Sequence, residues 1–349
     1  MSIFARSPYI LTINETGQTA SMVQLFLWNG NTTPMPSSPS YTLSKQIPSS
    51  NAPATYYDLS PYIREFINHN TLQNITTSNA STPSSQWCWV GIKKFKKTTG
   101  GFVQFESTTT LRCYDGFGYY EDGSNPNLSR VHLTPSSYYY YSDGTGNYGH
   151  LTIENIVGDS ITYTELNTGL TNTSGLGTAN VQDFPRVYPS YATNGNKIEI
   201  SNSGVIQWTG YFIPKSECKY TPVRIDFVNK FGAWQTEWFF KAFNESINIE
   251  NTEYNLMQSA YPSYSTLEGQ RKVFNSNGKQ SIRVNSDWVN DEYAEVIKQL
   301  MLSERIIIDY KKPAKINTKS TELFKSINTK MINYQLEFEY AYDIINSVV

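Results

Sequence analysis

The chain has 349 residues and a formal net charge of -2, so it is long enough for two domains and has no general electrostatic attraction for nucleic acid. Aromatic residues make up 14% and charged residues 17% of the sequence, which excludes a disordered chain and favours a β-rich one. Three cysteines without CxxC spacing exclude a disulfide framework, and no apolar run is long enough for a membrane span, so we expect no membrane insertion.

Residues 1–120 read as strands separated by turns that are rich in Pro, Gly, Asn and Ser. The segment 21–28 is apolar on both faces, which is typical of a central strand in a sandwich. The lysine-rich stretch 93–97 lies in an expected hairpin, where lysines more often face solvent than bind phosphate, so no nucleic-acid partner is expected. We predict a small β-sandwich of the fibronectin or immunoglobulin kind for residues 1–120.

Residues 121–204 differ in character, because Gly, Ser, Asn and Tyr replace the alternating aliphatic residues. We expect a loop-rich excursion with a few strands, which could reach a partner. Four consecutive tyrosines in this segment, Tyr138, Tyr139, Tyr140 and Tyr141, admit two interpretations. They could form a stacking platform for a sugar or for another protein, or they could pack back on their own sheet. We favour the interface interpretation.

Residues 205–349 are predicted to form a second β domain that is closed by one α-helix. The stretch "VRIDFVNKFGAWQTEWFF" is an expected hairpin with its turn at 229–232, and the pair Asn277-Gly278 predicts another hairpin. Apolar residues at helical spacing predict one helix at about 287–302. After it, "MINYQLEFEYAYDI" alternates between apolar and polar residues, which predicts a long strand with one wet face.

We find no motif for catalysis or for binding a cofactor or a metal. The three histidines lack metal-ligand spacing, and neither a phosphate-binding loop nor a GxSxG elbow occurs. Glu337 and Glu339 could form the acid pair of a glycan-cleaving enzyme, but the wet face of a half-buried strand explains them more simply. We therefore expect a protein that is not an enzyme, with no catalytic, cofactor-binding or metal-binding residue.

Several segments of the sequence resemble segments of known proteins. The segments "CKYTPVRIDFVNKFGAWQTEWFFKA", "NSDWVNDEYAEVIKQLMLSERIIID" and "INYQLEFEYAYDIINS" resemble, in this order, the C-terminal part of structural proteins of tailed phages that infect Bacteroidetes-type bacteria. The start of the same proteins is similar to four N-terminal segments of this chain, "SPYILTI", "LFLWNG", "YTLSKQIPSS" and "DLSPYIREFI". The resemblance covers both ends of the chain and leaves out the Tyr-rich middle.

This resemblance implies a virion protein of the tail tip or baseplate, made in the host cytoplasm and located in the virion tail. A sheet closed by one helix is also similar to tail-tube-like modules, which is an analogy of fold. The implied partners are copies of the chain itself in a ring-like homo-oligomer, together with other virion tail proteins. Under this hypothesis Phe231, at an exposed turn, and Phe239 would meet a neighbouring subunit.

The alternative is a carbohydrate-binding or host-attachment module. In that case the Tyr-rich segment would bind a glycan of the host surface, since tyrosine offers a large contact area with a polar tip.

Overall fold

The computed structural model describes residues 2–30, 34–47, 53–178, 180–241, 243–255, 267, 269–321 and 331–346. Strands dominate these residues, so the predicted mainly β fold class is confirmed. The finer prediction of an immunoglobulin-like or fibronectin-like sandwich stays a prediction.

The chain forms two compact units, each of which is discontinuous in sequence. Unit 1 comprises Met1–Ser216, Phe227–Glu237 and Glu295–Ser303, and unit 2 comprises Glu217–Asp226, Trp238–Ala294 and Glu304–Val349. The segments 1–120 and 121–204, which the sequence suggests as separate parts, thus belong to the same unit. One link between them is the pairing of β6 (Ala80–Ser81) with β14 (Val181–Pro185).

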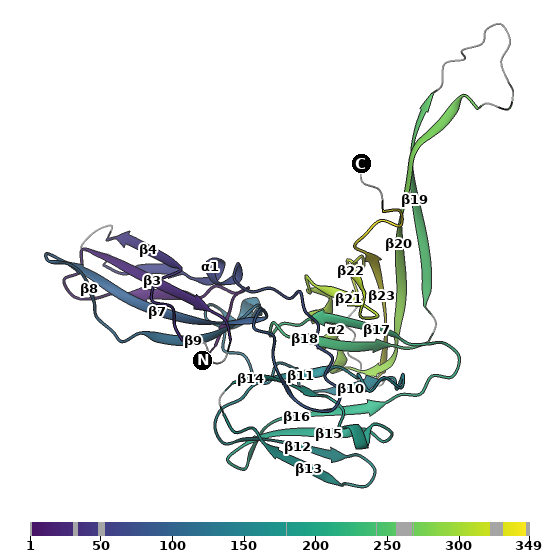
Figure 1. Cartoon of the computed structure of the whole chain (residues 1–349), viewed down its shortest axis with the longest axis horizontal. Helices are drawn as coiled ribbons and strands as arrows, with labels where there is room; N and C mark the ends of the chain where they lie inside the picture. Colours follow the sequence, from purple (N-terminus) through teal and green to yellow (C-terminus); the bar gives the residue numbers. More distant parts are fainter. Residues whose placement is uncertain are drawn as a thin grey trace, which may run out of the picture. The chain divides into compact units, whose positions relative to one another are not determined.

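The N-terminal part of unit 1 is built on a six-stranded sheet with the order β1-β9-β7-β3-β4, in which β8 also pairs with β7 (Figure 1). Its strands are β1 (Ile3–Phe4), β3 (Ala20–Trp28), β4 (Tyr41–Gln46), β7 (Trp87–Thr98), β8 (Gly101–Gln104) and β9 (Thr109–Tyr114). A separate two-stranded ladder joins β2 (Ile10–Ile13) to β5 (Thr55–Asp58), and helix α1 (Ser60–Arg64) follows β5.

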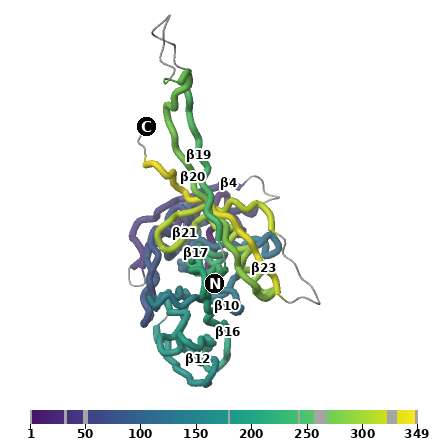
Figure 2. Tube along the Cα trace, turned by 90° about the vertical axis from the view of Figure 1, so that its right-hand side faces the viewer, coloured from purple at the N-terminus to yellow at the C-terminus, as the bar shows by residue number. Residues whose placement is uncertain are grey.

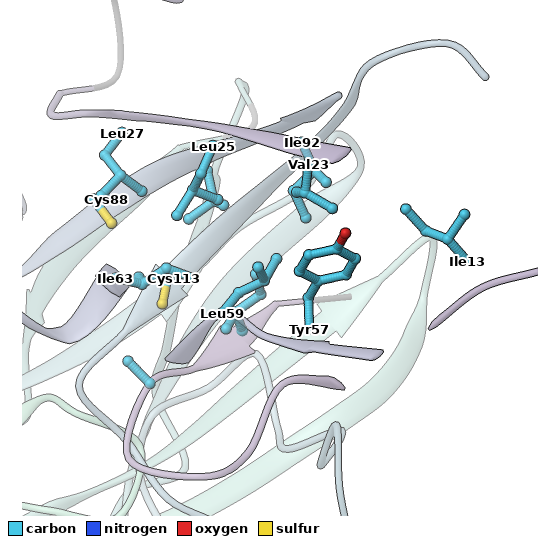
Figure 3. Close-up of a cluster of buried hydrophobic side chains, with 13 residues drawn as sticks. Ile13, Val23, Leu25, Leu27, Tyr57, Leu59, Ile63, Cys88, Ile92 and Cys113 are labelled. Carbon is cyan, nitrogen blue, oxygen red and sulfur yellow. The ribbon is translucent and has the colours of Figure 1, made fainter. Parts of the chain in front are cut away.

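Hydrophobic side chains from this sheet, the ladder and α1 form one buried cluster (Figure 3). Strand β3 contributes Val23, Leu25 and Leu27, which lie on one of its faces, and they share the cluster with Tyr57 of β5 and Ile63 of α1. Strand β3 lies between β7 and β4 in the sheet. Phe26 and Trp28 on its other face are buried as well, which agrees with a sequence that is apolar on both faces.

Residues 121–204 contain more strand than the sequence suggested. A five-stranded sheet has the order β10-β16-β15-β12-β13, and a three-stranded sheet has the order β11-β14-β6. Their further strands are β10 (Ser137–Tyr140), β11 (His150–Glu154), β12 (Asp159–Glu165), β13 (Thr171–Gly175), β15 (Asn196–Asn202) and β16 (Val205–Pro214). The few strands expected in this segment are confirmed, among them β11, β12 and β15. Strand β13 has the sequence "TNTSG", whose small polar residues give no hydrophobic period to detect.

A seven-stranded sheet has the order β18-β17-β21-β22-β23-β20-β19 and takes most of its strands from unit 2 (Figure 1). Its strands are β17 (Val223–Val228), β18 (Trp234–Phe239), β19 (Asn244–Asn255), β20 (Arg271–Asn290), β21 (Ile306–Ile308), β22 (Lys312–Ile316) and β23 (Met331–Tyr340). The predicted long strand is confirmed by β23.

The predicted helix exists as α2 (Tyr293–Met301), but it begins later than the expected residue 287. Trp288, Val289 and Asn290 instead belong to β20, where they pair with β23. The ladder bonds to β23 therefore decide the conformation of residues whose apolar spacing also fits a helix.

Strands β19 and β20 project from the rest of their sheet as a two-stranded ribbon, which both views show (Figures 1 and 2). We call the arm the strand β19 together with residues 271–280 of β20. The hairpin predicted at Asn277-Gly278 is wrong, because both residues lie inside the uninterrupted strand β20 and pair with β19. At a rise of about 3.4 Å per residue, a twelve-residue strand such as β19 spans roughly 40 Å.

Candidate functional site

The two phenylalanines expected at an interface are buried within their own chain. Phe231 is 4% exposed and Phe239 is 2% exposed. Every residue of β17 and of β18 is buried too, so both faces of this hairpin are covered. The expectation that Phe231 lies at an exposed turn is wrong, and neither ring offers a surface to a second chain.

The turn between β17 and β18 is fixed from inside by one side chain. The backbone N–H of Asn229 donates to the Ala233 carbonyl at 2.9 Å, and the N–H of Gly232 donates to the Asn229 carbonyl at 3.0 Å, which confirms the predicted turn. The Asn229 Oδ1 accepts the N–H groups of Phe231 at 3.0 Å and Ala233 at 3.2 Å, and its Nδ2 donates to the His132 carbonyl at 2.9 Å. The Phe231 ring stacks on the His132 imidazole with centroids 6.0 Å apart, so this turn packs inward.

Two of the four consecutive tyrosines are core residues. Tyr138 and Tyr140 are buried, and both lie on one side of β10 because alternate residues of a strand point to the same face. The Tyr138 hydroxyl donates to the Thr134 carbonyl at 2.6 Å, and its ring stacks on Phe212 at 5.5 Å. The Tyr140 hydroxyl donates to the Ala192 carbonyl at 2.6 Å. The interface interpretation is therefore wrong for these two rings.

The other two tyrosines are only half-buried. Tyr139 occupies the opposite side of β10, where the Lys215 ammonium lies 5.2 Å from its ring centroid, and Tyr141 follows the end of the strand. The alternation of a strand thus divides the tyrosine run between core and surface, so the four rings do not form one stacking platform.

The paired acids of β23 are matched by cations on neighbouring strands. Arg283 of β20 is directly opposite Glu337, and its guanidinium donates to Glu337 Oε2 at 2.9 Å. Lys315 of β22 is directly opposite Glu339, with 2.8 Å between Nζ and Oε1. The hydrogen bonds from Arg283 and Asn317 lower the pKa of Glu337 below its ordinary value. These ion pairs account for both acids as cross-strand pairs on the wet face of the sheet.

Two of the histidines each lie near one carboxylate: His69 Nδ1 is 3.9 Å from Asp115 Oδ2, and His150 Nε2 is 3.9 Å from Asp183 Oδ2. In the described ranges no three His, Cys, Asp or Glu side chains are placed to hold a metal ion. His132 is 2% exposed and lies in an aromatic environment, with the Tyr114 ring centroid 4.3 Å from its own. Burial lowers its pKa from 6.5 to about 4, so the imidazole is neutral at neutral pH.

The arm is covered far less than the rest of its sheet. All twelve residues of β19 are exposed, as are the six residues 271–276 of β20. A two-stranded hairpin alone is marginally stable in water, because it buries little apolar surface. A surface that packs on the arm would therefore stabilise it.

One face of the arm continues the core face of the sheet. Glu245 is directly opposite Ile282, which is buried together with Val284. Ile247 and Ile249 follow Glu245 at steps of two residues, so they lie on the same face as Ile282. They are 60% and 66% exposed. The apolar face of the arm, which we define as Ile247 and Ile249, thus extends beyond the point where the chain's own core ends.

The C-terminal segment covers part of this face near its base. The N–H of Ile344 donates to the Gly278 carbonyl at 2.8 Å, and the Asn277 side chain exchanges two hydrogen bonds of 3.0 Å with the backbone of Ile345. A Cβ at Gly278 would lie 3.0 Å from the Asn248 carbonyl oxygen and 3.1 Å from Ile344 Cδ1. Glycine at this position therefore serves close approach of the neighbouring chain segments rather than a turn.

The sequence signal for the arm was present but ambiguous. The stretch "NESINIENTEYN" alternates imperfectly and is rich in Asn and Glu, which are depleted in strands, so β19 was not predicted. The exposed isoleucines are the only part of it that follows a strand period.

Comparisons with known proteins add no family to this description. Neither the search of protein-family models nor the search of curated proteins gives a match to the chain. Across the described ranges, helices are too short or too polar to cross a lipid bilayer. The arm is accordingly the candidate functional site, on the strength of its own geometry.

Proposed function

We propose that the protein is a non-enzymatic structural subunit that assembles with copies of itself through the arm. The observation that carries this proposal is the apolar face, Ile247 and Ile249, which continues the core face of the sheet and stays 60% and 66% exposed beside the C-terminal segment. Exposed apolar surface of this kind marks sites of protein association. A long exposed strand edge would otherwise be a liability, since it can pair with any other strand.

The resemblance to structural proteins of tailed phages supports the virion tail as the place of this assembly. A subunit of a tail tip or baseplate has to contact identical neighbours and the adjacent layers of the tail, and a projecting arm is suited to both. We propose this location in the virion tail as the biological context, with other virion tail proteins as further partners.

The host-attachment alternative receives less support. It relied on the four consecutive tyrosines as a platform for a glycan, but the side chains of Tyr138 and Tyr140 are buried inside their own unit. Binding to host surface polysaccharide that persists after the arm is shortened would favour that alternative.

The test compares the wild-type chain with three variants by light scattering behind size exclusion and by negative-stain imaging. In the first variant Asn-Gly replaces residues 248–279, since these two residues favour a tight hairpin turn between the paired Ile247 and Gln280. The second carries Ile247→Ser and Ile249→Ser. The third is its matched control, Asn248→Ser and Thr252→Ser, on the opposite face of β19.

We expect closed rings for the wild type and the control, and monomers for the shortened arm. Each Ile→Ser change removes roughly 1–2 kcal/mol of apolar burial, so the second variant should assemble at least about tenfold more weakly. A wild-type chain that stays monomeric at high micromolar concentration, or a shortened chain that assembles normally, would contradict the proposal.

A further inference from the structure

We propose that Cys88 and Cys113 form a redox-active pair, which a low-molecular-weight disulfide converts into a reversible disulfide bond between β7 and β9. Both cysteines are free thiols in the structure. The inference concerns a modification site in unit 1, and it does not depend on the proposed assembly through the arm.

Strand pairing brings the two cysteines together. Strands β7 and β9 are antiparallel, and Cys88 is directly opposite Cys113 in their register. Both residues are 0% exposed and belong to the buried hydrophobic cluster of the N-terminal sheet (Figure 3). The two thiols therefore lie on the same face of the sheet, where the side chains of opposed residues are neighbours.

The backbone hydrogen bonds of β9 fix the spacing of the pair. The Ala5 N–H donates to the Tyr114 carbonyl at 2.8 Å, so the backbone N–H and C=O of Tyr114 face β1. Those of Cys113, the preceding residue, point the opposite way and face β7. Cys88 and Cys113 are thus a hydrogen-bonded pair, and the Cα atoms of such pairs are about 5.5 Å apart. This spacing lies within the usual range for disulfides, roughly 4.4–6.8 Å.

The Cβ atoms have to approach each other before the bond can form. Opposed Cβ atoms of an antiparallel pair are about 4.5–5.5 Å apart, whereas a disulfide needs roughly 3.5–4.5 Å. Closing this gap pulls β9 toward β7 and strains the new bond. A strained disulfide is reduced more easily than a relaxed one, so we expect the link to be reversible.

Burial protects the thiols while the sheet is closed. It is the main reason why the pKa of Cys113 is raised well above its ordinary value, and a hydrogen bond with the Cys88 thiol raises this pKa further. Thiolate is the form that attacks a disulfide, so the reaction is slow until the sheet opens locally. The short strand β1 pairs with β9 at Ile3 and Phe4, and its release would open this edge of the sheet.

The reaction exchanges one disulfide for another. The thiolate of one cysteine attacks a sulfur of the small disulfide, which breaks the S–S bond, forms a mixed disulfide and releases one small thiolate. The second cysteine then attacks the protein sulfur of the mixed disulfide and releases the other small thiolate. The pair loses two electrons and two protons, and the small disulfide is reduced to two thiols.

The experiment uses the full chain with Cys218→Ser, which removes the exposed third thiol. Oxidised glutathione is added at urea concentrations from zero to just below the unfolding transition. Iodoacetamide labelling of parallel samples reports when the thiols become accessible. In the matched control, Cys88→Ala and Val90→Cys move one thiol two residues along the same face of β7, to the position opposite Leu111. Intact mass and peptide mapping identify the products.

We expect a Cys88–Cys113 disulfide that forms at least about tenfold faster than any link in the control, because diagonal neighbours are about 7–8 Å apart. An excess of reduced glutathione should restore both thiols. Mixed glutathione disulfides as the end product, or equal linkage in the control, would overturn the inference. Thiols that iodoacetamide never labels below the unfolding transition would contradict it too, since the pair could not then react in the folded chain.

Discussion

At the scale of single residues, His132 shows how burial of an ionisable group makes stability depend on pH. Its imidazole lies among aromatic rings in unit 1, and neither ring nitrogen has a hydrogen-bond partner. A proton on the folded imidazole would therefore be poorly solvated, and burial lowers the pKa from 6.5 to about 4.

The sign of the effect follows from these two values. Between about pH 6.5 and pH 4 the unfolded chain binds a proton at His132 that the folded chain does not bind, so the folded state loses stability as the pH falls. We expect His132→Phe, which keeps an aromatic ring and cannot ionise, to remove this loss. When the pH is lowered from about 7.5 to about 5, the free energy of unfolding of the variant should rise by about 2 kcal/mol relative to that of the wild type.

Urea unfolding at the two pH values measures this difference. His69→Phe changes a histidine whose Nε2 lies 2.9 Å from the Gly232 carbonyl, and it serves as a comparison for loss of a bonded imidazole. An unchanged pH dependence in His132→Phe would show that His132 is not the group responsible.

At the scale of elements, the turn between β17 and β18 depends on the Asn229 side chain. This side chain takes part in bonds to two backbone N–H groups and one carbonyl, all of them buried. Asn229→Ala leaves these groups without partners, and we expect it to lower the free energy of unfolding by about 2–3 kcal/mol. Asn229→Asp keeps the acceptor and loses the donor, so it should recover part of the loss. Thermal and urea unfolding check this order, and equal stability of the alanine and aspartate variants would contradict it.

Elements with a strong hydrophobic period could be predicted from the sequence, and elements set by long-range pairing could not. The alternation in β3 and β23 was sufficient to predict these strands, and Asn229 and Gly232 were sufficient to place the turn between β17 and β18. The stretch 287–290 fits a helix equally well, and only its pairing with β23 makes it a strand. Gly278 marks close contact with Ile344, which no local pattern reveals.

The buried face of β17 also could not be predicted. Arg224 and Asp226 alternate with apolar residues, which is typical of a wet face, yet they are 1% and 0% exposed. The Arg224 guanidinium bonds to the Asp226 carboxylate at 2.8 and 2.9 Å and lies 3.6 Å from the Tyr310 ring centroid. A buried charge that is paired in this way looks like a surface charge in the sequence.

At the scale of the whole molecule, the proposed assembly through the arm should depend on salt, because β19 carries three glutamates and residues 271–280 of β20 carry three basic residues. Mobile ions screen pairs of exposed charges, with a screening length of about 10 Å at 0.1 M and about 3 Å at 1 M ionic strength. We expect the wild-type oligomer to dissociate at least about threefold more readily when sodium chloride is raised across that range. Analytical ultracentrifugation measures the change. Assembly that strengthens with salt would indicate that apolar contacts alone hold the oligomer.

Strand β20 runs without a break from the arm into the part of the sheet that pairs with β23, so an error in that pairing would also change the arm. A slip of one residue between β20 and β23 would turn Ile282 and Val284 out of the core and, in the same step, turn the arm over. The arm thus has no alternative orientation that leaves the rest of the sheet intact. A misregistered chain would lose its core, so in the proposed assembly faulty copies would be excluded by their own instability.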